Sequence, residues 1–347
     1  MRTLKVAVTA LNAIDSPGPG VGVIRAIRDC PDFEAQIIGL SYETLEPGIY
    51  MHKIVDKTYQ IPYPSAGSHT LLERLRYIHT QEKIDVIIPN FDSELINFIK
   101  IADKLRAWGI HTYLPSLKQL EKLDKLHLHE FGAAHQMIVP KTKFISSTDE
   151  IPQLADEFDY PLVVKGKLYE AFIAKSELEV YSFYARLAAK WGLPVVIQEF
   201  VSGTEIDIAG LGDGTGKLIG AIPIRKLYIT DKGKGWAGIT LKDEHLLQYT
   251  RDFIKASRWK GGFELEIMRS EDGKELYLME INPRFPAWIY TTAAAGQNLP
   301  AALVKLAVGM KQLPFRGYEV GKIFIRYSWD LITDINEFQQ IATTGEL

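Results

Sequence analysis

The residues best suited to chemistry follow an apolar run, Leu-Tyr-Leu-Met-Glu-Ile-Asn-Pro-Arg, at positions 276–284. Side chains alternate between the two faces of a strand, so Glu280 and Asn282 are expected to project to the same side. Carboxylate and amide oxygens are ligands that Mg²⁺ accepts, and the guanidinium of Arg284 suits a phosphate group. The run therefore predicts a site for a magnesium-bound polyphosphate.

A second strand is predicted at residues 262–269, where Glu264 and Glu266 alternate with apolar residues. The polar connection after it contains Asp-Gly, which favours a hairpin with the strand that follows. A loop of three or five residues would place Glu266 on the face of Glu280 and Asn282, whereas a two-residue turn would place it on the opposite face. We expect Glu266, Glu280 and Asn282 to ligate one metal ion. The alternative is an amphipathic hairpin with a merely solvated charged face, and for Glu264 neither interpretation is favoured.

Length and composition limit the class of protein. The chain has 347 residues, 46% of them hydrophobic, and a formal net charge of −3. It is long enough for roughly two or three domains. The charge argues against a nucleic-acid partner, and no apolar run approaches the roughly 20 residues that span a bilayer. Cys30 is the only cysteine, which fits a reducing compartment. We expect a cytoplasmic protein with no nucleic-acid or membrane partner, and a homodimer as the default assembly.

Alternating strands and helices are predicted for residues 1–115, which is typical of a parallel α/β sheet. The predicted strands span residues 4–10, 35–40, 84–89 and, at the sheet edge, 111–114, and the predicted helices span 23–28, 71–79 and 96–108. Gly18, Gly20 and Gly22 lie in a turn whose spacing departs from GxGxxG. A tight strand-to-helix turn is favoured there over a phosphate-binding loop.

Longer helices and antiparallel strands are predicted after residue 115. The predicted helices span residues 117–134, 181–191, 245–259 and 291–309, and the predicted strands span 161–165, 194–200, 204–211, 217–225 and 322–329, besides the acidic hairpin. Strands 204–211 and 217–225 are expected to pair across a glycine-rich turn. We divide the chain into residues 1–115, 116–200 and 201–347.

The chain resembles the ATP-grasp superfamily, closest to its carbamoyl-phosphate-synthase-like branch. The resemblance lies in Asp-Lys at 124–125, the strand lysine at 165, Gln-Glu-Phe-Val at 198–201 and Glu-x-Asn-Pro-Arg at 280–284. It covers nearly the whole chain. It implies an α/β N-terminal parallel-sheet (pre-ATP-grasp) domain followed by a two-subdomain α+β ATP-grasp fold. The first subdomain would carry the phosphate-binding lysines and the second the metal site.

The resemblance also implies the reaction and its basic residues. In this superfamily ATP lies between the two subdomains, the γ-phosphate passes to a carboxylate, and a nucleophile attacks the acyl phosphate. Lys125 and Lys165 would contact the ATP phosphates. Arg225 would face the reacting phosphoryl group, although its neighbour Lys226 could take that role, and Arg284 would contact the same group.

The segment 198–205 is similar to the nucleotide hinge of the superfamily. Glu199, Phe200 and the backbone of Val201 would bind the adenine edge, since a strand end offers free N–H and C=O groups. Glu205 would accept hydrogen bonds from the ribose hydroxyls. An ordinary edge strand followed by a charged turn is the alternative.

One segment departs from the family pattern. The superfamily carries a glycine-rich flap after the strand lysine, whereas residues 166–175 contain a single glycine. Backbone cradling of phosphate is therefore less free. Lys167 or Lys175 would substitute by charge, or Tyr169 and Phe172 would contact a substrate instead.

These observations favour an ATP-dependent carboxylate–amine ligase that uses ATP and Mg²⁺, or Mn²⁺ in its place. The expected substrates are a small-molecule carboxylate and an amine, for which an amino acid or a peptide fits. Two alternatives stay open. One is phosphorylation of a small carboxylate, as in carbamoyl phosphate synthesis, without amide formation. The other is a nucleotide-binding regulatory protein without turnover.

Overall fold

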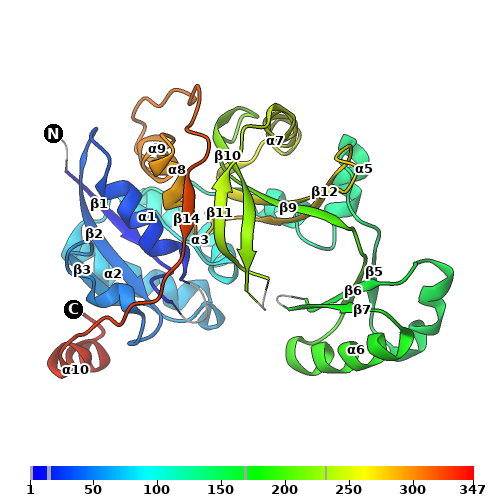
Figure 1. Ribbon diagram of the computed structural model, residues 1–347. Coiled ribbons are helices and arrows are strands. Elements are labelled where there is room, and N and C mark those ends of the chain that lie inside the picture. The colour runs from blue at the N-terminus through cyan, green and yellow to red at the C-terminus, as the bar shows by residue number, and fades with distance from the viewer. Residues whose placement is uncertain (1–2, 14–16, 168–169, 231–232) are drawn as a thin grey trace.

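The structure is a computed structural model that describes residues 3–13, 17–167, 170–230 and 233–347. Its strands form three sheets, with the first at the left of Figure 1, the second in the middle and the third at the lower right. No helix in these ranges is long and apolar enough to cross a bilayer. The architecture confirms the predicted order of a parallel α/β region followed by mainly antiparallel regions.

The first sheet is parallel and has the strand order β3-β2-β1-β4. Its strands and the helices around it are β1 (Thr3–Val8), α1 (Pro19–Arg28), β2 (Glu34–Ser41), β3 (Lys57–Gln60), α2 (Gly67–Glu82), β4 (Val86–Ile88) and α3 (Asp92–Ala107). The predicted elements of this region are present. Two details differ: β3 has no counterpart among the predicted strands, and the predicted strand at 111–114 is a single bridge between His111 and Val86.

The glycine turn before α1 is held by the end of β1. A Cβ on Gly20 would lie 2.1 Å from the carbonyl oxygen of Thr9, and one on Gly18 would lie 2.6 Å from that of Ala10. The first helical residue, Pro19, has no N–H, and the N–H of Gly20 donates to Ala10 O at 3.0 Å. The first two positions of α1 therefore have no free backbone N–H group to donate to a phosphate. The turn serves to connect β1 to α1.

The third sheet has the strand order β5-β8-β6-β7, with antiparallel neighbours throughout. Its elements are β5 (Thr142–Ile145), β6 (Leu162–Lys165), β7 (Ala171–Ala174), α6 (Glu177–Trp191) and β8 (Val195–Glu199). The predicted strands at 161–165 and 194–200 are β6 and β8, and β5 and β7 are additional. Before this sheet, the single helix predicted at 117–134 is instead two short helices, α4 (Leu117–Lys122) and α5 (Leu128–His135).

The second sheet is antiparallel and has the strand order β13-β12-β9-β10-β11-β14. Its elements, with the helix between them, are β9 (Gly203–Asp213), β10 (Leu218–Ile229), β11 (Gly235–Thr240), α7 (Glu244–Ser257), β12 (Lys260–Ser270), β13 (Leu276–Asn282) and β14 (Ile323–Ile325). Both predicted strand pairs are present. β11 has no predicted counterpart, and the strand predicted at 322–329 is only the short β14.

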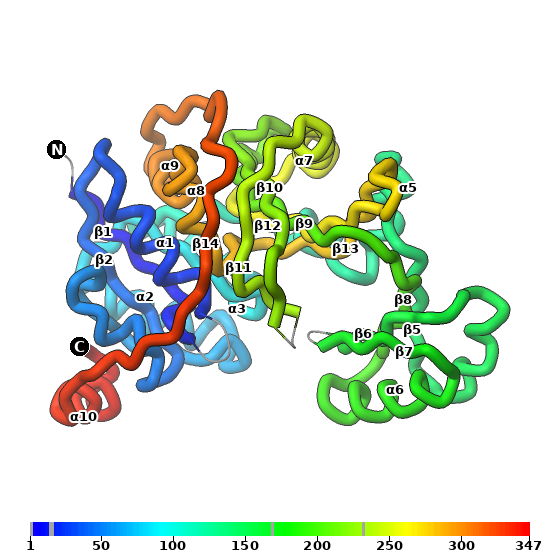
Figure 2. The backbone as a smooth tube through the Cα atoms, viewed as in Figure 1, coloured from blue at the N-terminus to red at the C-terminus, as the bar shows by residue number. Residues whose placement is uncertain are grey.

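The C-terminal part of the chain returns to the first sheet. The helix predicted at 291–309 is split into α8 (Tyr290–Ala294) and α9 (Leu299–Ala307). After β14 the chain runs past the first sheet and ends in α10 (Ile335–Thr344), next to α2 in Figures 1 and 2. Residues 201–347 therefore contribute to two separate places in the molecule.

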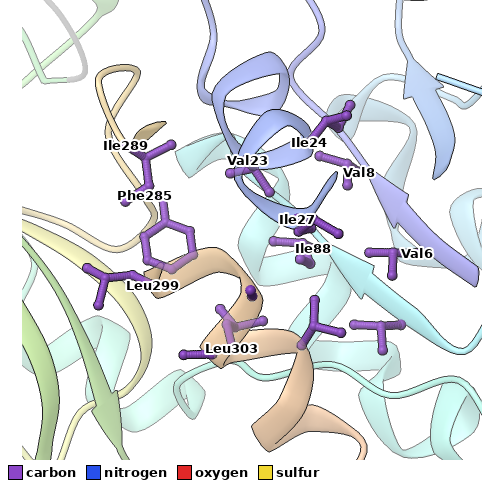
Figure 3. Close-up of a cluster of buried hydrophobic side chains, with 14 of the residues drawn as sticks. Val6, Val8, Val23, Ile24, Ile27, Ile88, Phe285, Ile289, Leu299 and Leu303 are labelled. Atoms are coloured by element: carbon purple, nitrogen blue, oxygen red, sulfur yellow. The ribbon is translucent and has the colours of Figure 1, made fainter. Parts of the chain in front are cut away.

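A hydrophobic core joins the first sheet to the chain that follows β13 (Figure 3). Its buried side chains from these two regions include Val6, Val8, Val23, Ile24, Ile27, Ile88, Phe285, Ile289, Leu299 and Leu303. Burial of each such side chain contributes roughly 1.5–3 kcal/mol. Because Phe285 directly follows Arg284, this core anchors the loop that carries the guanidinium.

Candidate functional site

A β-bulge sets the register of the two acidic strands, β12 and β13. Ile267 pairs with Leu278. The next pair is Glu266 with Glu280, which leaves Met279 as the extra residue. Without the bulge, Glu280 would share the core face with Leu278, because a shift of one residue exchanges the faces of a strand. The bulge therefore places Glu266 and Glu280 opposite each other on one face.

The hairpin turn is not of the predicted length. Ser270 N donates to Glu275 O at 3.1 Å, so the connection between these two residues is the four residues 271–274. An even connection would by itself leave Glu266 on the wrong face for a shared site. The bulge, and not an odd-numbered loop, brings Glu266 to the face of Glu280 and Asn282. The predicted common face is therefore present, but for a different reason.

Four side chains of β12 and β13 gather on this face: Glu264, Glu266, Glu280 and Asn282. Asn282 Nδ2 donates to Glu264 Oε2 at 3.0 Å and to Glu266 Oε1 at 2.9 Å. Both N–H groups of the amide are thus used on carboxylates, so its Oδ1 is the atom of this side chain that could ligate a metal ion. Glu264 is only 6% exposed and also accepts from Trp288 Nε1 at 2.9 Å, so it is not a solvated surface residue.

Burial and crowding perturb the two facing carboxylates in opposite directions. Burial raises the pKa of Glu280, and the charge of Glu266 raises it further. Burial also raises the pKa of Glu266, but Lys226 and the hydrogen bond from Asn282 outweigh it, so the net pKa lies below the ordinary value. A divalent cation between the two carboxylates would relieve their repulsion.

The donor set fits Mg²⁺ or Mn²⁺. Directly opposite residues in an antiparallel pair have Cβ atoms about 4.5–5.5 Å apart, which lets Glu266 and Glu280 reach one ion. No three His, Cys, Asp or Glu side chains are already grouped around one point in the described ranges. The set therefore consists of two carboxylates and the amide oxygen of Asn282, all hard oxygen ligands, with room for phosphate oxygens and water.

Lys226, rather than Arg225, enters this acidic face. The side chain of Lys226 is 7% exposed and lies 3.1 Å from Asp207 Oδ2, and it also bonds Glu205. Arg225 pairs with Ile206 in the sheet and is exposed, so it projects to the other face. Burial lowers the pKa of Lys226, but the surrounding carboxylates outweigh it and keep the amine protonated. The acidic face therefore receives Lys226, the alternative considered for this position, and the role of either residue at the reacting phosphoryl group stays a prediction.

The predicted lysines Lys125 and Lys165 both reach the acidic face. Lys125 Nζ lies 3.1 Å from Glu280 Oε1. It stands in the break between α4 and α5, where Asp124 Oδ1 accepts from the backbone N–H of His127 at 3.0 Å and so competes with helical bonding. Lys165 is at the end of β6, where burial lowers its pKa and the charge of Glu280 acts against that shift.

An apolar cavity of about 220 Å³ lies beside these lysines. Its apolar lining is Leu126, Leu128, Val139, Phe144, Val196 and Met279, and its polar members are Lys125, His129, Glu130, Thr142, Lys165 and Gln198. Gln198 is 5% exposed, and its Oε1 has no hydrogen-bond partner while its Nε2 donates to Thr142 Oγ1 at 3.2 Å. A bound molecule with an N–H group would satisfy this buried acceptor.

The predicted hinge residues 199–201 and 205, all within the described ranges, are not among the residues that line this cavity. Glu199 is exposed at the end of β8, and its Oε2 accepts from the backbone N–H of Lys141 at 3.1 Å. Phe200 and Val201 follow in the connection to β9, and Phe200 is 36% exposed. Glu205 lies on the acidic face and accepts from Lys226. Gln198, which was not singled out from the sequence, is the side chain of this segment that lines the cavity.

A polar cavity of about 250 Å³ opens on the other side of the acidic face, against the first sheet. Arg284 lines it, with its Nη1 at 3.2 Å from Glu264 Oε2 and its Nε at 3.4 Å from Asp92 Oδ2. Burial lowers the pKa of Arg284, but these carboxylates outweigh it. Asp92, at the start of α3, thus ties the first region of the chain to the loop after β13.

Comparison with known proteins agrees with this geometry. A model of the family described as ATP-grasp in the biosynthetic pathway with Ter operon matches residues 193–323, which include the whole acidic face. The large chain of carbamoyl phosphate synthase from Clostridium acetobutylicum is 26% identical over 270 residues, which are 72% of this chain and 24% of that protein. Over these residues the chain is similar to proteins of the ATP-grasp superfamily.

Solved structures show the same ATP-grasp fold. The biotin carboxylase domain of 2-oxoglutarate carboxylase from Hydrogenobacter thermophilus, solved with MgADP, ADP and bicarbonate, aligns with a TM-score of 0.70 at 20% identity, over 92% of this chain and 73% of that one. N5-carboxyaminoimidazole ribonucleotide synthetase from Thermotoga maritima aligns with a TM-score of 0.62 at 17% identity, over 92% and 78% of the chains. At these identities the likeness concerns the fold alone.

The segment 166–175, which was compared with the family's flap, joins β6 to β7 and includes β7. Phe172, one of the two predicted substrate contacts, stacks on Phe183 of α6 with ring centroids 4.8 Å apart. Lys167 and Lys175 are exposed. Tyr169, the other predicted substrate contact, lies outside the described residues.

Proposed function

We propose that the protein is an ATP-dependent ligase that activates a substrate carboxylate as an acyl phosphate and passes the acyl group to an amine or another nucleophile. One arrangement supports this proposal: the facing carboxylates Glu266 and Glu280 lie between the apolar and the polar cavity. Glu280 is tied to Lys125, which lines the apolar cavity, whereas Glu266 lines the polar cavity. A phosphoryl group held at this pair would have the nucleotide on one side and the acceptor carboxylate on the other.

The apolar cavity would take the adenine ring. Its aliphatic and aromatic walls suit a flat base, and the unpaired Oε1 of Gln198 suits the exocyclic amino group of adenine. The backbone of Val201 would add hydrogen bonds at the same edge, with Glu199 and Phe200 beside it. Glu205 would accept from the ribose hydroxyls after its present donor, Lys226, shifts toward the phosphates.

The charged residues would supply the catalysis of phosphoryl transfer. Glu266, Glu280 and Asn282 would hold Mg²⁺, which when bound neutralises polyphosphate charge. Lys125 and Lys165 would hold the phosphates on the nucleotide side, and Lys226 and Arg284 would stabilise charge on the acceptor side. Positioning and electrostatics account for this kind of transfer, so no covalent nucleophile of the protein is required.

The change Glu280→Gln tests the metal role. Loss of one hard ligand and its charge is expected to lower ATP-dependent release of ADP about 100-fold, which corresponds to roughly 3 kcal/mol of transition-state stabilisation. ADP release with a panel of carboxylic acids and amines, measured across a Mg²⁺ titration, checks this. Glu271→Gln, in the exposed hairpin turn, is the matched control. Near-normal turnover of Glu280→Gln would contradict the assignment.

The same measurement separates the two alternatives. The chain spans 24% of the length of the carbamoyl phosphate synthase relative, so that protein's whole activity does not transfer to it. Release of ADP with bicarbonate or carbamate alone, without an amine product, would favour phosphorylation of a small carboxylate. Tight ATP binding with no ADP from any acid would favour a regulatory nucleotide-binding protein.

The proposal extends to assembly and location. The Hydrogenobacter thermophilus neighbour is a domain dimer, which supports a homodimer here. Cys30 as the single cysteine supports a reducing, cytoplasmic location. The expected partners are small molecules, with no nucleic acid and no membrane.

A further inference from the structure

The polar cavity has two chemically different walls. One wall comes from the first region of the chain: the turn before α1 and the connection between β4 and α3. The other comes from the second sheet and the loop after β13, and it carries the acidic face with its basic residues. A substrate in this cavity would therefore meet different groups at its two ends.

The first wall presents hydrogen-bond acceptors that lack donors. Asn90 is 1% exposed, and its Nδ2 donates to Ile88 O at 2.9 Å, but its Oδ1 has no partner. Asp92 uses Oδ2 on Arg284, and its Oδ1 is also buried and unpaired. The same holds for Asn12 Oδ1. Leaving a buried acceptor unsatisfied costs about 1–3 kcal/mol, so three at one wall indicate a ligand that donates hydrogen bonds.

Within the described part of this wall, no basic residue competes for these acceptors. The described lining residues of the first region are Asn12, Pro17, Gly18, Pro19, Asn90, Phe91 and Asp92. The start of α1 offers no early backbone donor, because Pro19 has no N–H and that of Gly20 is used. Among these described lining residues the one charged member is Asp92. The wall is thus suited to a cationic, N–H-rich group.

The opposite wall is suited to an anion. Four cations line it, namely Lys226, Lys234, Arg284 and Arg326. The described lining residues include four carboxylates to match them, namely Asp92, Asp207, Glu264 and Glu266. The formal charges of these described residues balance, with Asp92 on the first wall and the four cations on the opposite wall. Such a polarised but neutral lining fits a zwitterion better than a simple anion.

We propose that the acceptor substrate of this cavity is a small amino acid, bound with its ammonium group against Asn90 and Asp92 and its carboxylate toward Arg284 and Lys226. This inference rests on the proposed ligase function and names its substrate class. The cavity of about 250 Å³ has the size of a single small molecule. In the reaction, a carboxylate oxygen of the amino acid bonds to the γ-phosphorus, the bond to the β-phosphate oxygen breaks, and ADP leaves.

Hydroxylamine trapping tests which molecule is activated. The protein is incubated with ATP, Mg²⁺, hydroxylamine and one acid, and the hydroxamate is measured together with ADP. Hydroxylamine nitrogen attacks the acyl carbon, loses a proton, and displaces phosphate. The acids are matched pairs that differ in the amino group: alanine and propionate, leucine and 4-methylpentanoate, phenylalanine and 3-phenylpropionate, glutamate and glutarate.

For at least one pair, kcat/KM for the amino acid is expected to be about 100-fold or more higher than kcat/KM for the matched acid that lacks the amino group. A site that hydrogen-bonds a substrate group discriminates strongly against an analogue that lacks it, because its own buried groups are then left unpaired. Hydroxamates formed equally well from both members of every pair would overturn the amino-acid assignment and leave the ligase function intact. No ADP and no hydroxamate from any acid would overturn the ligase function itself.

The change Asp92→Asn tests the wall separately. It keeps an oxygen acceptor but removes the charge, so the preference for the amino acid over its partner is expected to fall about 10-fold. Any loss of Arg284 positioning would lower turnover of both acids together and leave their ratio unchanged. Asp103→Asn, on the same helix and 95% exposed, is the control. An unchanged ratio in Asp92→Asn would place the ammonium group elsewhere and overturn the proposed binding mode.

Discussion

Two neighbouring basic residues, Arg225 and Lys226, have opposite environments because strand side chains alternate. Lys226 is buried between Asp207 and Glu205, whereas Arg225 is exposed on the other face. The sequence alone shows a basic pair at the end of an apolar strand and does not show which member faces the acids. The face is decided by the pairing of β10 with β9, where Ile224 lies opposite Asp207.

Removal of the buried amine is expected to be far more harmful than removal of the exposed guanidinium. Lys226→Met leaves two carboxylates without their partner, and we expect a loss of about 3–5 kcal/mol in the free energy of unfolding together with loss of ADP release. Arg225→Met is expected to change stability by less than about 0.5 kcal/mol. Denaturant unfolding and ADP release of both variants check this. Equal effects of the two changes would show that Lys226 is not the residue at the site.

Two site residues escaped the sequence for a physical reason. For Glu264 the sequence favoured neither a solvated nor a functional role, and in the structure it accepts hydrogen bonds from Asn282, Arg284 and Trp288. Gln198 has no charge and stands among apolar residues. Its importance lies in an unpaired, buried oxygen, which only packing reveals. The residues that were found have types, carboxylate, lysine and arginine, whose chemistry is visible without coordinates.

At the scale of elements, the bulge at Met279 is the feature on which the acidic face depends. Leu276 and Leu278 face the core, and the next core residue is Ile281, three positions on instead of two. This break in the period-two pattern is the sequence signal of the bulge. The alternation of Glu280 and Asn282 does not reveal the bulge, because both residues follow it in the chain.

Deletion of Met279 is expected to abolish ADP release and to destabilise the protein by several kcal/mol. The strand would then pair without a bulge, and Glu280 and Asn282 would turn into the apolar core while Ile281 would turn out of it. Met279→Leu, which keeps the extra residue and an apolar wall for the apolar cavity, is the matched control. Thermal unfolding and turnover of the two variants distinguish the roles. Full activity of the deletion variant would show that the register is not what places Glu280.

The break between α4 and α5 shows the same limit of sequence patterns. The charged stretch at 117–134 is compatible with one helix, and its helical parts were predicted. The interruption comes from Asp124, whose Oδ1 accepts from the backbone N–H groups of Leu126 and His127 at 2.9 and 3.0 Å. The contact of Lys125 with Glu280 further favours the break over a continuous helix. Because this contact joins distant parts of the chain, a local sequence pattern does not reveal it.

On the scale of the whole molecule, the polar cavity lies between two regions that the end of the chain ties together. Leu347 exchanges backbone hydrogen bonds with Thr58 at 2.6 and 2.9 Å, and Arg74 Nη2 donates to Gly345 O at 2.9 Å. Ile341 of α10 is fully buried against Ile49 and its neighbours. The chain before α10 leads back to β14 at the edge of the second sheet (Figure 2). The C-terminal segment thus holds the wall of the polar cavity that contains Asn90 and Asp92 in place opposite the wall that contains Lys226 and Arg284.

Weakening the contact of α10 with the first region is expected to weaken binding of the carboxylate substrate and to leave binding of ATP unchanged. Ile341→Ala removes buried surface worth about 2–5 kcal/mol and should free α10 locally, so KM for the carboxylate should rise several-fold. The apolar cavity is lined by residues between Lys125 and Met279, far along the chain from α10, so the Kd for ATP should not change. Ile335→Ala, on the same helix but 62% exposed, is the control. Steady-state kinetics give KM, and calorimetric titration gives Kd. A parallel rise in both constants would mean that α10 supports the general stability of the protein, whereas a rise in KM alone would show that the distance between the two walls sets acceptor binding.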